Sequence, residues 1–242
     1  MCQVLEVIRK GFFMSIFKRS EKTSSEGSSK ALSRKNQALI LYDRGDLDGA
    51  LELYKEEERI CRELGDKAGL SDSLGDQGNI LSSRGDMDGA MELYKEQERI
   101  CRELGHKAGL SRSLHNQANI LADRGDPDGA LELYKEEERI CRELGDMGRI
   151  QTCLNDQGVT LRNRGDLDRA MELYKEQERI CRELGLKEGL SISLASQAIV
   201  LSDQGKKKEA LSLARSANEI AEKAGYMPLA KQIKTTIEQI KQ

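Results

Sequence analysis

The side chains of this sequence that could do chemistry are its two histidines, six cysteines and many glutamates. Nucleophilic catalysis needs a nucleophile beside a base, and a zinc site needs Cys or His at ligand spacing. Neither His106 nor His115 has a repeated Ser, Cys or Asp partner, and no CxxC pair or Cys/His cluster occurs. The glycines are single helix stops and form no phosphate-binding loop. We therefore expect no catalytic residue, no metal and no cofactor.

Four of the cysteines hold one repeated position, which indicates a structural role. Copies on neighbouring parallel helices would lie about 9–10 Å apart. A disulfide needs Cα atoms within about 7 Å. We expect buried thiols in a reducing compartment, the cytoplasm. These cysteines are Cys61, Cys101, Cys141 and Cys181.

The glutamates belong to a segment that recurs every 40 residues. ALELYKEEERICRELGD occupies 50–66 and returns unchanged at 130–146, and AMELYKEQERICRELG occupies 90–105 and 170–185. A faded fifth copy, ALSLARSANEIAEKAG, occupies 210–225. This period indicates stacked supersecondary units, each in contact only with its neighbours.

Each unit reads as two helices, here called helix A and helix B. In the unit 66–105, Leu70, Leu74 and Leu81 share one face of helix A. Gly85 ends helix A and Asp86 caps helix B, while Gly65 and Asp66 do the same between units. The A–B turn glycines are Gly45, Gly85, Gly125, Gly165 and Gly205.

Residues 1–30 are expected to be a leader and a flexible Ser-rich linker. Three interpretations of 1–19 stay open: a start at Met14 with a short mobile leader, a helix against the first repeat, or a membrane-surface anchor. The expected units are 31–65, 66–105, 106–145, 146–185 and 186–225, and a capping helix over 226–242 begins near Pro228.

Composition narrows the functional classes further. The net charge is −3 and the pI is near 5.7, so no sequence-wide basic field favours nucleic acid. No run of about 18 apolar residues occurs, and we expect no transmembrane segment. Aromatic residues make up only 4%, which suits a thin array of amphipathic helices better than one large core.

The repeated positions resemble the tetratricopeptide repeat over about residues 31–225. Leu74, Gly78 and Leu81 fit the family pattern of helix A, and Ala90 and Tyr94 fit that of helix B. The long period resembles the subclass of kinesin light chain and Pins-type adaptors. The resemblance implies an all-α, right-handed α-solenoid of five helix pairs with a C-terminal capping helix. Its structural positions would be Ala50, Tyr54, Gly85, Ala90, Tyr94, Gly125, Ala130, Tyr134, Gly165, Ala170 and Tyr174.

Two departures from the subclass pattern suggest a polar ladder. Helix A carries Gln where an apolar residue is usual, and helix B carries Glu-Glu or Gln-Glu where Ala-Leu is usual. The helix-A Gln could bond helix B within or between repeats, or both could stay at the solvent rim. The positions are Gln37, Gln77, Gln117, Gln157 and Gln197, with Glu57-Glu58, Gln97-Glu98, Glu137-Glu138 and Gln177-Glu178.

In the family, helix A lines a concave groove, which implies a non-catalytic scaffold that binds a peptide or helix of a partner protein. Helix A also varies between copies, whereas helix B is nearly constant. Duplication of an 80-residue pair with neutral drift would explain the same contrast, and the Leu/Met and Glu/Gln alternation of helix B supports it. The candidate contacts are Asn79, Ser82, Ser83, Arg112, His115, Asn119, Asp123, Asn155, Val159, Arg162, Asn163, Ile199 and Asp203.

Capture of an acidic chaperone tail is not expected, because Thr152 and Asp156 stand where the family's clamp needs bases. Two alternatives to the scaffold remain. The chain could self-associate as a structural or regulatory module, or it could serve as an accessory subunit of an enzyme complex.

Overall fold

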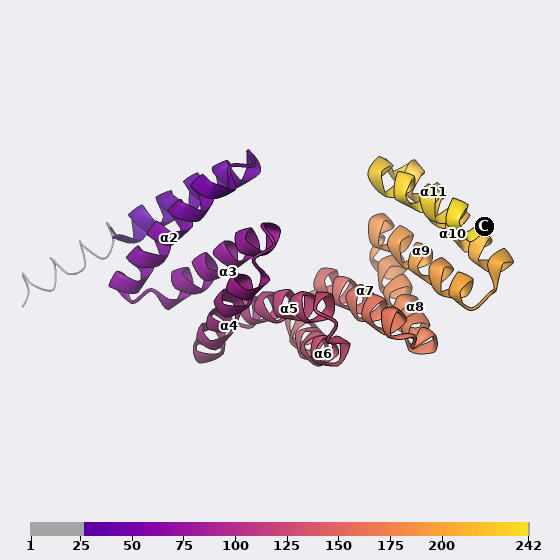
Figure 1. Ribbon diagram of the computed structural model, residues 1–242, viewed down its shortest axis with the longest axis horizontal. Coiled ribbons are helices and arrows are strands. Elements are labelled where there is room, and N and C mark those ends of the chain that lie inside the picture. Colours follow the sequence, from indigo (N-terminus) through magenta and orange to yellow (C-terminus); the bar gives the residue numbers. More distant parts are fainter. Residues whose placement is uncertain (1–26, 242) are drawn as a thin grey trace, which may run out of the picture. The chain divides into compact units, whose positions relative to one another are not determined.

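The computed structural model describes residues 27–241, and every element of that range is a helix (Figure 1). The expectations for the leader, its start at Met14 and linker residues 20–26 lie outside the described residues. Residues 27–30, which were expected to be linker, are instead helical and begin the first helix. After a helix over residues 27–43, the chain forms α2 (Leu47–Leu64), α3 (Lys67–Ser83), α4 (Met87–Leu104), α5 (Lys107–Asp123), α6 (Pro127–Leu144), α7 (Met147–Arg164), α8 (Leu167–Leu184), α9 (Lys187–Asp203), α10 (Lys207–Ala224) and α11 (Met227–Lys241).

Repeated Asp and Gly residues set the helix ends, as the sequence predicts. Asp66 and Asp86 each accept a hydrogen bond at 3.0 Å from the backbone N–H three residues on. Each satisfies one of the first orphan donors of its helix. Gly65 and Gly85 adopt φ values of 69° and 83°, the left-handed region that glycine enters without a steric penalty. Helices of nearly constant length follow from these signals.

The chain divides into two compact units, Met1–Ser113 and Leu114–Gln242, and the boundary falls within α5. In the first unit, α3 packs against both α2 and α4. In the second, α7 packs against α6 and α8, α9 against α8 and α10, and α11 against α10. Within each unit, these helices pack on their neighbours in the chain, as expected of stacked repeats.

Small residues let the A and B helices cross closely. Ala90 is fully buried and Tyr94 is 2% exposed. A Cβ atom at Gly78 would lie 2.5 Å from Cε1 of Tyr94, so the ring occupies the space that a larger residue would need. The same burial holds for the equivalent helix-B pairs, Ala50 and Tyr54, Ala130 and Tyr134, and Ala170 and Tyr174.

Glutamine side chains join successive repeats in a polar ladder. Nε2 of Gln77, Gln157 and Gln197 donates at 2.7 Å to Oε2 of a helix-B glutamate 19 residues earlier. The three glutamines are 3–5% exposed, so these bonds satisfy buried amides. The ladder between repeats is confirmed at these three places. Its acceptors are Glu58, Glu138 and Glu178.

Among the described residues, none of the helices combines the length and apolar character that crossing a bilayer requires.

Candidate functional site on the A helices

Helix A presents one polar face and buries the other. In α3, Ser73, Leu74 and Gln77 are buried, whereas Asn79 and Ser83 are exposed. Residues three and four apart share a helix face, so the polar side chains of α3 form one open strip. The other A helices have an equivalent strip, and we call it the helix-A face of each repeat.

Tyrosine hydroxyls from helix B orient two asparagines of the A helices, Asn79 and Asn119. The Tyr94 hydroxyl donates to Oδ1 of Asn79 at 2.8 Å, and the Tyr134 hydroxyl donates to Oδ1 of Asn119. Each bond spans the two helices of one repeat. It fixes which way the carboxamide points, because its oxygen is the acceptor.

Ion pairs between successive A helices use several predicted contact residues. Arg112 and Lys35 both pair with Asp72, at 3.1 and 2.9 Å. In the second unit, Arg162 pairs with Asp203 at 2.6 Å. All of these side chains are about a quarter to a half exposed, so each pair contributes little stability. Arg112 and Arg162 are predicted ligand contacts, and their ion pairs could not be seen from the sequence alone.

The remaining predicted contacts differ in position. The Ser82 hydroxyl lies 3.7 Å from the Met87 sulfur, at the A–B turn. The Ser83 hydroxyl bonds the Asn79 carbonyl of its own helix. Asp123 and Asn163 are exposed, as is Val159, whereas Asn155 and Ile199 are half-buried.

A buried ion cluster joins α5, α6 and α7 beside this face. Glu137, whose side chain is 1% exposed, accepts from Nη2 of Arg149 at 2.7 Å and lies 3.1 Å from Nδ1 of His115. Nδ1 of His115 is also 3.8 Å from Asp156. The buried carboxylate thus has a guanidinium partner and a histidine partner, and these contacts offset its desolvation.

The surroundings of the cluster change the pKa values of His115 and Asp156. Burial lowers the pKa of His115, but the hydrogen bond to Glu137 and the charges of Glu137 and Asp156 outweigh burial, so the net pKa is raised above 6.5. Burial raises the pKa of Asp156, although His115 opposes that shift. The expectation that His115 has no repeated Ser, Cys or Asp partner left this contact with Glu137 unpredicted.

The equivalent site in the first unit lacks one cation. Glu57 takes the place of Glu137, Lys35 that of His115 and Asp76 that of Asp156, but Gly69 stands where Arg149 stands. Burial raises the pKa of Glu57 to about 7 and that of Asp76 to about 6. The sequence does mark Arg149 as unusual, because the other copies of its position are Gly69, Gly109 and Gly189.

Where helix B carries Gln instead of Glu, the facing residue of helix A changes too. Opposite Gln97, Gly75 stands at the position of Lys35 and His115 in the neighbouring repeats. A Cβ atom at Gly75 would lie 3.0 Å from the carboxamide carbon of Gln97. The Glu/Gln alternation is therefore matched by a packing partner in helix A, in addition to any record of duplication.

A family model described as tetratricopeptide repeat matches residues 29–103 and 78–143. Together with the helix pairs, the Gly turns and the Ala–Tyr crossings, this match decides the family. The chain is a tetratricopeptide repeat protein. A comparison with curated proteins gives no significant match.

Solved structures similar to this tetratricopeptide protein share its fold at low sequence identity. BtubC (BKLC) from P. vanneervenii is 20% identical, with a TM-score of 0.73 over 85% of this chain and 92% of that one. The nearly identical TPR-like repeats of a proposed kinesin light chain from Podosopora anserina are 18% identical, with a TM-score of 0.69 over 82% and 97%. A Rap protein complexed with Competence and Sporulation Factor is 13% identical, with a TM-score of 0.67 over 88% and 65%.

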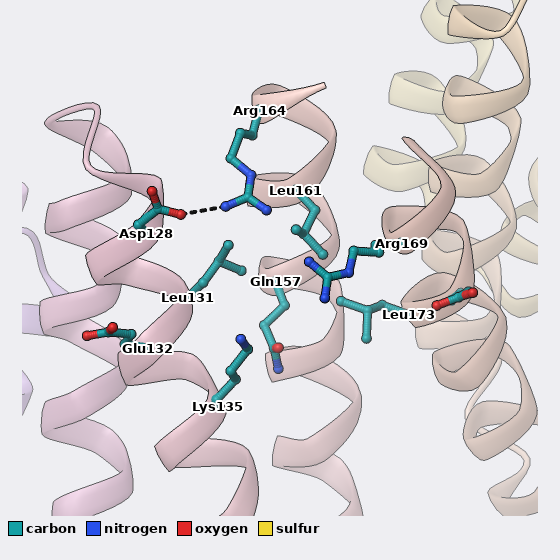
Figure 2. A pocket seen from close by; sticks show the side chains of 10 residues that line it. Asp128, Leu131, Glu132, Lys135, Gln157, Leu161, Arg164, Arg169 and Leu173 are labelled. Carbon is teal, nitrogen blue, oxygen red and sulfur yellow. Dashed lines mark hydrogen bonds and ion pairs between the residues drawn. The ribbon is translucent and has the colours of Figure 1, made fainter. Parts of the chain in front are cut away.

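The tetratricopeptide array also has hollows between successive B helices. Figure 2 shows one of them, where Asp128 pairs with Arg164 beside the side chains of Leu161 and Gln157. Its volume is about 410 Å³, and the ion pair is 2.5 Å long. The equivalent hollow one repeat later measures about 590 Å³. These hollows are not predicted from the sequence. The first is formed by α6, α7 and α8, and its lining residues are Asp128, Leu131, Glu132, Lys135, Gln157, Leu161, Arg164, Arg169, Glu172 and Leu173.

The cysteines of this tetratricopeptide protein are unsuited to nucleophilic chemistry. The five cysteines in the described part of the chain are free and buried. Burial raises the pKa of Cys61 and of Cys181 to about 11, so each stays a thiol at neutral pH. Within residues 27–241, no group of three His, Cys, Asp or Glu side chains could hold a metal ion.

Proposed function

We propose that this chain is a non-catalytic interaction scaffold, and that the helix-A face binds a peptide or helix of a partner protein. Tetratricopeptide repeat proteins generally serve protein–protein interaction. The observation that carries the proposal is the contrast within each repeat. Helix B is nearly constant and structural, whereas the open face of helix A changes from copy to copy.

Fixed asparagines suit an extended peptide. Asn79 and Asn119 each present a carboxamide held by a tyrosine, and a carboxamide can both donate to and accept from a peptide backbone. Groups that are already oriented lose less conformational entropy on binding. The Rap protein solved with Competence and Sporulation Factor supports the proposal, because its chain has a similar fold.

The proposal is tested with partners that co-purify with the chain from its native cell. Ser83→Arg and Asn163→Arg place a long charged side chain on exposed positions of the helix-A face. Glu92→Arg places the same side chain on an exposed position of helix B and serves as the matched control. We expect either helix-A variant to reduce partner retention at least about tenfold and the control to change it little. Equal retention by all three variants would contradict the proposal.

Self-association is the second candidate, and one observation favours it. Ile40 is 51% exposed, whereas its repeat equivalents Ile80 and Val200 are fully buried. Leu32 and Leu39 of the same helix are 59% and 42% exposed. Light scattering tests this candidate: a dimer that Ile40→Glu converts to a monomer would support it, and a monomeric wild type would remove it.

We also propose a cytoplasmic location, with no cofactor and no nucleic-acid ligand. Buried free thiols suit a reducing compartment. The net charge of −3 provides no extended positive field for a nucleic acid.

A further inference from the structure

The site around Glu57 and its copy around Glu137 differ at three positions: Lys35 against His115, Asp72 against Thr152, and Gly69 against Arg149. In the second unit, the buried Glu137 carboxylate is held by Arg149 at 2.7 Å and by His115 at 3.1 Å. Arg149 reaches it from the first turn of α7, the A helix that follows in the chain. This arrangement shows which ligand chemistry satisfies a carboxylate at this position: a guanidinium donating one N–H to one oxygen.

In the first unit, the corresponding carboxylate lacks that partner. Glu57 is 3% exposed, and its Oε2 atom has no hydrogen-bond partner. Gly69 provides no side chain in place of Arg149. Lys35 is close enough to lower the pKa of Glu57, but its ammonium is hydrogen-bonded to Asp72 at 2.9 Å. A buried carboxylate oxygen left in this state is costly.

Neighbouring charges make the site acidic overall. The charged groups that act on Glu57 are Lys35 from the first helix and Asp66, Asp72 and Asp76 from α3. Lys35 and Arg112 both pair with Asp72. They also lower the pKa of Asp76, but burial outweighs them and raises it to about 6. Asp76, which is half-buried, is the second carboxylate that acts on Glu57.

We propose that Glu57 and Asp76 form a site for an arginine or lysine side chain of the bound partner, which takes the role that Arg149 plays in the second unit. The inference deepens the proposed function by naming the partner's chemistry, and it rests on that function. A guanidinium fits better than an ammonium, because its planar fork can donate to both carboxylates. The chain would recognise a basic residue with the first unit and supply its own in the second.

The site predicts a definite pH dependence. A cation binds the ionised carboxylate, and the pKa of Glu57 is about 7. Binding therefore strengthens as pH rises through 7 and weakens as Glu57 becomes protonated below it. The bound cation in turn lowers the pKa of Glu57.

The test uses the full chain with acetyl-arginine amide as the probe and the neutral, isosteric acetyl-citrulline amide as the control. The side-chain carboxyl carbon of Glu57 is followed by NMR at about pH 8 and assigned by its loss in Glu57→Gln. We expect a saturable shift with half-saturation in the range of about 1–10 mM, an affinity suited to a single charged contact. We expect at least about tenfold weaker binding of citrulline amide, and weaker arginine binding at about pH 5.5.

Two variants separate the site from general charge effects. Gly69→Arg supplies the side chain that the second unit already has, and it should abolish the response to the probe and lower the pKa of Glu57. Glu57→Gln puts at this position the residue type that other repeats have at Gln97 and Gln177, so the variant should fold. It should lose the response to acetyl-arginine amide, which is then measured at the side-chain carboxyl carbon of Asp76. An equal response to both amides, or an unchanged response at Asp76 in Glu57→Gln, would overturn the inference.

The outcomes also distinguish this inference from the proposed function. If Ser83→Arg and Asn163→Arg release the partner while acetyl-arginine amide leaves Glu57 unshifted, only the cation site is overturned. If the amide binds but no helix-A variant changes partner retention, the cation site stands and its role in partner recognition is overturned.

Discussion

At the scale of single residues, one position of helix B decides how charge is buried in this protein. The position holds Glu57 and Glu137 in alternate repeats and Gln97 and Gln177 in the others, and all four are 1–3% exposed. The facing residue of helix A is basic opposite Glu57 and Glu137, Lys35 and His115 respectively, and is neutral opposite the glutamines. The pattern keeps each buried carboxylate near a positive charge.

Glu57→Gln should stabilise the chain at alkaline pH. The folded pKa of Glu57 is about 7, above its ordinary value of 4.5, so its favourable contribution is present below about 4.5 and is lost as pH rises through 7. At about pH 8 the substitution removes a buried charge, and we expect the free energy of unfolding to rise by about 1–3 kcal/mol. Urea unfolding at about pH 8 and pH 4 measures this, with little difference expected at the lower pH.

Gln97→Glu is the matched control for that substitution. It places a carboxylate beside Gly75, where no cation faces it, and should destabilise the chain at about pH 8. A gain in stability from Gln97→Glu would show that burial of charge does not govern this position.

Arg149→Gly should expose the strain of an under-paired carboxylate in the second unit. It removes the 2.7 Å partner of Glu137 and reproduces the state of Glu57. We expect a loss of about 2–3 kcal/mol in the free energy of unfolding at neutral pH, because breaking a buried pair leaves a charge uncompensated. Calorimetry measures the loss. Glu137→Gln in the same chain should recover most of it, and failure to recover would point to lost packing of the Arg149 stem.

At the scale of helices, the ladder between repeats makes a coupled pair testable. Gln157 donates to Glu138 at 2.7 Å, and Glu138 also accepts from Arg142 at 2.6 Å. Gln157→Leu and Glu138→Leu each remove the Gln157–Glu138 hydrogen bond, although Glu138 keeps Arg142 in the first variant. The double variant should therefore be less harmful than the sum of the two single variants. We expect a coupling free energy of about 0.5–1.5 kcal/mol from a double-mutant cycle. Strict additivity would mean that the bond contributes nothing.

The sequence predicts the helices well and the site only in part. Asp and Gly punctuation identifies helix ends because capping depends on residues three apart, as for Asp66 and the Gly69 N–H. The ladder is foreseeable because Gln157 breaks an apolar stripe. The Arg149–Glu137 bond is not, because it depends on how far a long side chain reaches across a helix crossing. The Arg162–Asp203 ion pair is not foreseeable for the same reason, because Asp203 comes from the next A helix.

At the scale of the whole molecule, each helix depends on its neighbours in the chain and not on a shared centre. Ile233 in α11 is 2% exposed and packs with α10 residues such as Ala217. In stacked repeats, destabilisation spreads mainly to adjacent units. We expect Ile233→Ala to accelerate amide hydrogen exchange strongly in α9–α11 and much less in α2–α4. Equal acceleration throughout would mean that the chain unfolds as one cooperative block.

The placement of the buried charges also affects how such an array can grow. Lys35 and Glu57 lie in one repeat, as do His115 and Glu137, so duplication of a whole repeat carries each of these pairs with it. Arg149 is the exception, because it reaches Glu137 from the following repeat. Insertion of a repeat at that junction would separate the guanidinium from its carboxylate, whereas insertion at the other junctions would leave the pair intact.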